Sequence, residues 1–157
     1  MSDIKISILV VDDMNFIRES IKGYIEGNTN RNVAGTEFDF DITLSSNAEE
    51  AILLYARDKH EIIIMDLSME KIDGIEATKE ILEINPEAKI IGIASEGDAK
   101  VEEFKKSGIK FFIEKPFQST YINSKIDILV KEIFKEKSLS ELDIKKKKRT
   151  LLKKIFS

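Results

Sequence analysis

The feature that most constrains the fold is a regular alternation of short apolar segments with amphipathic ones. Residues 4–11 form a nearly continuous apolar run rich in β-branched side chains. Such a run is typical of a strand that is buried on both faces of a parallel sheet. Residues 14–26 then carry apolar side chains at helical spacing, and Gly27 and Asn28 mark the end of that segment. The first unit is therefore a strand, a loop and a helix.

The same unit recurs until five strands and five helices have been completed. The expected strands are residues 4–11, 38–44, 60–65, 89–94 and 109–113, and the expected helices are residues 14–26, 47–56, 74–84, 99–106 and 121–137. Alternating strands and helices with short connections imply right-handed crossovers and a parallel sheet with helices on both faces. We therefore predict one doubly wound α/β domain over residues 1–137, and we expect the polar residues 27–37 to form a surface loop.

Charge is distributed unevenly along the chain. The formal net charge is -4, but residues 145–157 contain seven Lys or Arg and no acid, which leaves -11 on residues 1–144. Direct DNA binding by this acidic body is not expected, because affinity for phosphate depends on clustered Lys and Arg. Residues 138–157 form a separate C-terminal tail. As a basic amphipathic helix capped by residues 138–141, the tail would suit an acidic partner, a membrane or nucleic acid; a disordered tail is the alternative.

Composition excludes several classes of chemistry. The chain has no cysteine, so disulfides, thiolate metal sites and thiol nucleophiles are excluded. No apolar run reaches the roughly 18 residues of a membrane span, and the first residues lack the basic-then-apolar pattern of a secretion signal. We therefore expect a cytoplasmic protein. The single histidine, His60, stands at the start of an expected strand, and we expect it at the surface or at a helix end.

Acidic side chains follow two of the expected strands. Asp12 and Asp13 come directly after the first strand, and Asp66 closes the third. In a doubly wound sheet, ligands bind beyond the carboxyl ends of the strands, so these carboxylates should converge. Their mutual repulsion would be relieved by a hard divalent cation such as Mg²⁺. An aspartate can also attack a phosphoryl group to give an acyl phosphate, and Lys115, after the last strand, could reach the same cluster as a point charge for phosphate. The bond from Lys115 to Pro116 is a candidate for the cis isomer.

These motifs, in this order, resemble those of response-regulator receiver domains. The matching segments are Ile8 to Asp13, Phe16 to Arg18, Met65 to Met69 with Asp73-Gly74, and Gly108 leading to Lys115-Pro116-Phe117. The resemblance covers residues 4 to about 137 and is specific as a set, although each segment alone is weak. It implies a flavodoxin-like fold with a five-stranded parallel sheet in the order 2-1-3-4-5. It also implies a stand-alone, CheY-like signalling domain rather than an enzyme, at most capable of phosphorylating and dephosphorylating itself.

The resemblance assigns roles to individual residues. Asp66 would be the phosphoacceptor, and Mg²⁺ or Mn²⁺ would be held by Asp12, Asp13, Asp66 and the backbone carbonyl of Ser68. Lys115 would pair with the phosphoryl group. The family's aromatic switch falls on Phe112, which lacks a tyrosine hydroxyl. A histidine kinase or phosphotransfer protein would supply the phosphoryl group, and a downstream protein would bind residues 99–137. Chemotaxis is one process that the resemblance suggests.

The sequence also departs from the family pattern. Gap-free counting from Asp66 places Ala94 where the family has a switch Ser or Thr, and we favour Ser95 as its substitute if the strand end shifts by one residue. Ser95 could equally be a helix cap, and Phe112 could be an ordinary core residue. Glu96 would add a negative charge beside the phosphoryl group. The departures leave two alternatives: a pseudo-receiver that binds partners without phosphorylation, and a metal-dependent phosphatase with an aspartyl nucleophile. Phosphatases of that type carry Asp-x-Asp after the first strand, whereas this chain has Asp12-Asp13.

Overall fold

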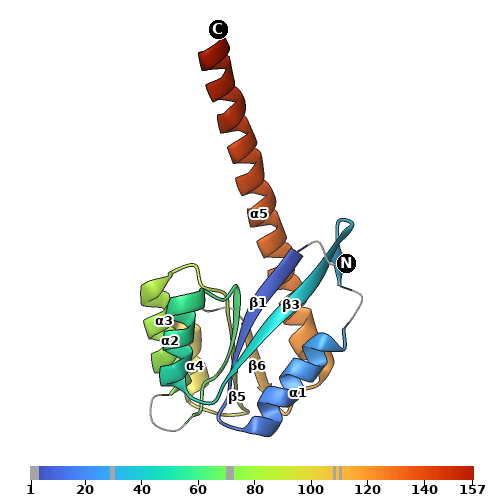
Figure 1. The fold of residues 1–157 in the computed structure, drawn as a ribbon. Coiled ribbons are helices and arrows are strands. Elements are labelled where there is room, and N and C mark those ends of the chain that lie inside the picture. The colour runs from blue at the N-terminus through green and yellow to red at the C-terminus, as the bar shows by residue number, and fades with distance from the viewer. Residues whose placement is uncertain (1–3, 29–30, 70–72, 108, 110) are drawn as a thin grey trace.

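The computed structural model describes residues 4–28, 31–69, 73–107, 109 and 111–157 (Figure 1). The strands are β1 (Ile4–Val11), β2 (Asn32–Val33), β3 (Thr36–Ser45), β4 (Ile62–Asp66), β5 (Ile90–Ser95) and β6 (Phe111–Lys115). The helices are α1 (Asn15–Glu26), α2 (Ala48–Asp58), α3 (Gly74–Ile84), α4 (Lys100–Lys106) and α5 (Ser119–Phe156). Each expected strand and helix is present, with bounds that shift by at most two residues, except that the last helix runs 19 residues past its predicted end at residue 137.

The sheet has the order β2-β3-β1-β4-β5-β6. Its five long strands are parallel to their neighbours and reproduce the predicted order 2-1-3-4-5. The predicted number of strands was too low by one, because β2 pairs antiparallel with β3 at the edge of the sheet. Since β1 lies between β3 and β4, the chain reverses its direction of winding at β1, and the carboxyl end of that strand is the switch point at which ligands bind in such sheets.

Helices cover both faces of the sheet (Figure 1). Helices α1 and α5 pack on one face around residues such as Ile8, Ile64 and Ile126, and helices α2, α3 and α4 pack on the other around Leu9, Met65 and Phe104. Alternate residues of β1 and β4 therefore enter different cores, as the period of two along a strand requires. Both faces of these strands are buried, which explains why their sequences are continuously apolar.

The segment predicted to be a surface loop, residues 27–37, is instead partly a β-hairpin. Asn32–Val33 pairs with Thr36 and Glu37 across a turn at Ala34 and Gly35, which have φ values of 52° and 82°. Two successive positive φ angles are the mark of a tight two-residue hairpin turn. Arg31 anchors the hairpin to α5, because its guanidinium donates to Asp127 and Asn123 at 2.6 Å each. Only residues 29 and 30 of this segment lie outside the described part of the chain.

His60 directly follows the C-cap of α2, as the predicted helix-end position allows, but it is buried, so the predicted surface position was wrong. Helix α2 is followed by the C-cap residue Lys59, whose left-handed backbone (φ 49°) turns the chain back toward the sheet. The turn places the imidazole beside Tyr55 and Ile133, in a cavity of about 220 Å³ at the amino edge of the sheet. Burial lowers the pKa of His60 below its ordinary value, which keeps the ring neutral.

The tail is helical and continuous with the domain's last helix. Helix α5 runs from Ser119 to Phe156 without a break and projects beyond the body (Figure 1). Residues 138–141 therefore do not cap a separate helix, and the disordered alternative does not describe this structure. The Lys115–Pro116 peptide bond before α5 is cis, as hypothesised. Among the described residues, no helix combines the length and apolarity needed to cross a membrane.

Candidate functional site

The carboxyl edge of the sheet brings four predicted site residues together. Asp12 and Asp13 directly follow β1, Asp66 is the last residue of β4, and Lys115 is the last residue of β6. The Lys115 ammonium lies 3.2 Å from Asp12 Oδ2 and 3.5 Å from Asp66 Oδ2. One carboxylate oxygen from each of Asp12, Asp13 and Asp66 lies within 4.8 Å of the other two. Parallel strands end at the same edge, so side chains separated by about a hundred residues in sequence meet here.

Asp12 is a buried carboxylate whose charged form is destabilised by its surroundings. It is 1% exposed, and burial raises its pKa from 3.8 to about 6, with a further contribution from the charge of Asp66. The backbone N–H of Met14, which donates to Asp12 Oδ1 at 2.9 Å, and the Lys115 ammonium oppose this rise in pKa. One ammonium therefore does not fully compensate the buried negative charge, and a further cation would be stabilised at this site.

The raised pKa predicts how replacement of Asp12 affects stability. Because the folded state favours the protonated carboxyl, Asp12 costs stability progressively as the pH rises from about 4 to about 6. In the presence of a chelator, Asp12→Asn should therefore raise the free energy of unfolding by about 2 kcal/mol at about pH 8. At about pH 4 the substitution should have little effect, since the carboxyl is then neutral. Urea unfolding at the two pH values measures both quantities.

Asp13→Asn is the matched control for that measurement. Asp13 lies next to Asp12 but is exposed to water, so its neutralisation should change stability by less than about 0.5 kcal/mol at either pH. If Asp12→Asn raised the free energy of unfolding equally at both pH values, ionisation of Asp12 would not be the cause of the stabilisation.

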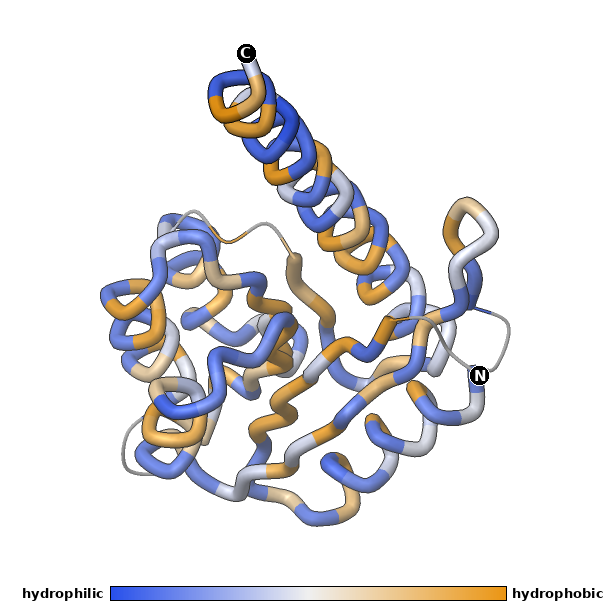
Figure 2. The backbone as a smooth tube through the Cα atoms, turned by 45° about the horizontal axis from the view of Figure 1, so that its top comes forward, coloured by the Kyte–Doolittle hydropathy of each residue, from blue (hydrophilic) through white to orange (hydrophobic). Residues whose placement is uncertain are grey.

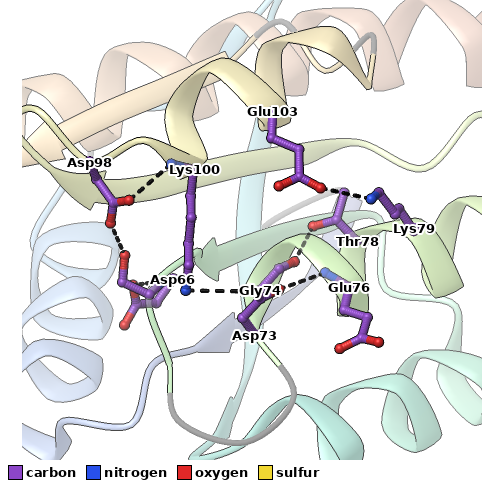
Figure 3. A network of polar contacts seen from close by, with 10 residues as sticks. Asp66, Asp73, Gly74, Glu76, Thr78, Lys79, Asp98, Lys100 and Glu103 are labelled. Carbon is purple, nitrogen blue, oxygen red and sulfur yellow. Dashed lines mark hydrogen bonds and ion pairs between the residues drawn. The ribbon is translucent and has the colours of Figure 1, made fainter.

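Asp66 is held at the start of a loop that other polar residues brace. It is 2% exposed, and its Oδ1 accepts a hydrogen bond from the backbone N–H of Ser68 at 3.0 Å. The Ser68 hydroxyl donates to Asp98, which also accepts from the backbone N–H of Lys100 at 2.9 Å. The Lys100 ammonium lies 3.5 Å from Asp73 Oδ2, so Asp98 and Lys100 at the start of α4 contact both ends of the loop after β4 (Figure 3).

Sequence reasoning did not identify Asp98 and Lys100. The available signal was Gly97-Asp98 in front of an expected helix, since an aspartate at that place is typical of a helix start. That signal predicts local capping and says nothing of the contact with Ser68, which lies 30 residues away. Hydrogen bonding to Ser68 lowers the pKa of Asp98, so the group remains an ionised acceptor.

Gly74 packs directly against the backbone of the predicted phosphoacceptor. A Cβ atom at this position would lie 1.9 Å from the Asp66 carbonyl oxygen and 2.7 Å from Leu67 Cα. The side chain of Asp73 caps the start of α3 by accepting from the backbone N–H of Glu76 at 2.9 Å. The Asp73-Gly74 pair therefore starts α3 and allows this helix to approach the end of β4 closely.

The two predicted switch residues lie on the neighbouring strands. Ser95 is the last residue of β5, is exposed, and is in register with Lys115 of β6, whereas Ala94 is buried. Phe112 is partly buried in β6 and packs on the core formed with α2, α3 and α4. Ser95 thus lies at the same edge as the carboxylates, and Phe112 lies three residues inward from Lys115. The N-cap of α4 is Ala99, without a side-chain cap hydrogen bond, so Ser95 does not cap this helix. The position of Phe112 agrees with the core alternative.

The donor set fits a hard divalent cation. Asp12, Asp13 and Asp66 offer only carboxylate oxygens, which are the ligands that Mg²⁺ and Mn²⁺ accept. Two of these carboxylates are buried and one is exposed, so the cluster opens toward solvent on one side. Mg²⁺ usually retains several waters and takes one or two carboxylates together with phosphate oxygens, which such an open cluster allows.

The doubly wound fold, with its acidic cluster and lysine at the carboxyl edge, is that of a receiver in two-component signalling. The family model of the response regulator receiver domain matches residues 8–127. The chain belongs to this family, whose members are signalling domains and generally not enzymes.

Similar proteins include bacterial chemotaxis proteins. The chain is 40% identical over 116 residues to the chemotaxis protein CheY of Thermotoga maritima, covering 73% of this chain and 89% of that protein. It is 35% identical over 113 residues to CheY of Bacillus subtilis, covering 71% and 87% of the two chains. Among solved structures, the receiver domain of Francisella response regulator 1452 superposes with a TM-score of 0.68 at 26% identity, covering 81% and 98%.

Proposed function

We propose that the protein is a phosphorylation-dependent signalling domain in which Asp66 accepts a phosphoryl group. The observation that carries the proposal is the position of Lys115, whose ammonium lies within 3.5 Å of both Asp12 and Asp66. A histidine kinase or a phosphotransfer protein in the cytoplasm would be the donor, and the CheY relatives favour a role in chemotaxis. Phosphoryl transfer depends mainly on positioning and charge compensation, which this cluster supplies.

The chemical step is an exchange of one bond to phosphorus for another. A carboxylate oxygen of Asp66 attacks the phosphorus of a phosphohistidine, a P–O bond forms, and the P–N bond to the imidazole breaks. The electron pair of that bond returns to the departing imidazole. Lys115 pairs with the phosphoryl oxygens and offsets their charge. The hydrogen bond from the Ser68 N–H to Asp66 Oδ1 orients the carboxylate for attack.

Asp12, Asp13 and Asp66 would hold Mg²⁺ or Mn²⁺, together with the Ser68 backbone carbonyl that the family pattern assigns. When bound, the ion compensates negative charge on the carboxylates and on the phosphoryl oxygens. The pKa of about 6 for Asp12 implies that protons compete with the ion in mildly acidic solution.

The output surface that we propose comprises α4, β6 and the start of α5, within residues 99–137. The new phosphoryl charge would attract Lys115 and the hydroxyl of Ser95, and Phe112 would move inward in response. The Ser68–Asp98 hydrogen bond and the Asp73–Lys100 ion pair give a second connection from the Asp66 loop to α4 (Figure 3). Phosphorylation would then shift the population of conformers that bind a downstream protein.

Incubation with acetyl phosphate and Mg²⁺, followed by intact-mass measurement, tests the proposal. We expect the mass of a single added phosphoryl group, which requires Mg²⁺ and is lost in mild base, because an acyl phosphate hydrolyses readily. An unchanged mass would support the pseudo-receiver alternative. Sustained turnover of an aryl phosphate in a parallel assay would support the phosphatase alternative.

A further inference from the structure

The part of α5 that follows Lys137 extends away from the domain as an exposed helix. Every residue from 138 to 157 is exposed. Among the ion pairs of the described residues, the last two along the chain fix the base of this extension: Lys89 with Glu136 at 2.9 Å and Lys137 with Glu61 at 2.7 Å. At about 1.5 Å per residue, the helix reaches roughly 30 Å beyond its base. Tertiary contacts therefore fix where the extension leaves the body but cover none of its length.

Beyond Leu142, the apolar side chains of this extension gather on one side. Ile144, Leu151, Leu152, Ile155 and Phe156 are between 52% and 82% exposed. At about 100° per residue, these five side chains, here called the apolar arc, fall within about 140° of the helix circumference. The arc continues the buried side of α5, which holds Ile126 and Ile133 within the body. In Figure 2 orange segments alternate with blue ones along the projecting helix.

Positive charge surrounds the apolar arc. Residues 144–157 contain seven Lys or Arg and no acid. Five of them, Lys145 to Arg149, are consecutive and therefore point to every side of the helix. Their repulsion opposes helix formation, and an exposed helix of this length is only marginally stable without a partner. A partner that both neutralises the cations and covers the arc would stabilise the helix on both counts.

We propose that residues 144–156 bind an anionic lipid surface. A basic helix with one apolar side lies in the plane of a bilayer interface, with its apolar side chains below the headgroups. Lysines on all sides suit a diffuse negative surface, because their flexible stems can reach the headgroups even from within the arc, as Lys148 would. Nucleic acid would neutralise the cations but leave the apolar arc in water. An acidic groove on a protein would contact only some of the Lys and Arg side chains that surround the helix.

The direction of α5 makes this contact compatible with signalling. The helix begins just after Lys115 at the carboxyl edge of the sheet and runs back past the amino edge (Figure 1). The carboxylates Asp12, Asp13 and Asp66 therefore lie at the opposite end of the body from the extension. A membrane contact through residues 144–156 would leave the phosphoacceptor edge open to a donor protein.

Flotation of the intact chain with lipid vesicles tests this proposal. We expect binding to vesicles of phosphatidylcholine with phosphatidylglycerol at low salt, and none to phosphatidylcholine alone. The double variant Leu151→Ser/Ile155→Ser should weaken binding by about tenfold or more, because it removes two apolar contacts and no charge. The matched control is Leu53→Ser/Leu139→Ser, which replaces leucines of similar exposure on α2 and on the opposite side of the extension.

Three results would overturn the proposal. The first is an absence of binding to the anionic vesicles. The second is equal binding by wild type and by Leu151→Ser/Ile155→Ser, which would reduce the contact to charge alone. The third is binding to random-sequence duplex DNA, measured by gel shift, that is tighter than binding to the anionic vesicles and is unchanged in the double variant. That result would assign the extension to nucleic acid.

Discussion

Asp66→Asn is expected to abolish incorporation of phosphate from acetyl phosphate in the presence of Mg²⁺. An amide lacks the anionic oxygen that attacks phosphorus, so the P–O bond cannot form even though Lys115, at 3.5 Å from Asp66, is still in place to pair with phosphoryl oxygens. The side chains have the same shape, and an amide oxygen can still accept from the Ser68 N–H. The substitution should therefore remove the chemistry while the fold persists, and intact mass together with circular dichroism measures both.

Asp39→Asn is the matched control for this substitution. Asp39 is an exposed aspartate on β3 whose side chain accepts a hydrogen bond from the next backbone N–H, that of Phe40, at 2.9 Å. Its variant should be labelled like wild type. If Asp66→Asn were still phosphorylated to the wild-type level, or carried an acid-stable phosphoryl group, the assignment of Asp66 as the phosphoacceptor would be contradicted.

Gly74→Ala should be the most destabilising of the single substitutions considered. The added methyl group would lie 1.9 Å from the carbonyl oxygen of Asp66, and the atoms that it meets belong to the backbone and cannot rotate away. Either α3 or the end of β4 must move. We expect a loss of about 3 kcal/mol or more in the free energy of unfolding, and a melting temperature lower by roughly 10 °C. Thermal and urea unfolding measure these quantities.

Gly23→Ala is a control that should change the free energy of unfolding in the opposite direction. Gly23 lies on the exposed side of α1, and a Cβ atom there meets nothing within 4 Å. Alanine should stabilise the helix by about 0.5–1 kcal/mol, because it restricts the unfolded chain more than glycine does. If Gly74→Ala changed stability by no more than Gly23→Ala does, the close approach of α3 to Asp66 would not be required for the fold.

The sequence by itself determined the architecture and the position of the site. Apolar runs such as residues 4–11 and 62–65, separated by amphipathic segments, indicate a parallel sheet between two layers of helices. In such a sheet the residue after a strand lies at the functional edge, which is why Asp12, Asp13, Asp66 and Lys115 could be grouped without coordinates. These inferences depend on local periodicity and on strand ends, both of which can be read from neighbouring residues.

Only the tertiary structure decided how those residues are held and charged. The pKa of Asp12 depends on its burial and on Asp66, and the Ser68–Asp98 hydrogen bond joins segments from two different strands. The burial of His60 and the anchoring of Arg31 on α5 likewise result from packing between distant elements. Electrostatic and hydrogen-bond energies depend on distance in space, and sequence spacing specifies that distance only within a single helix, strand or turn.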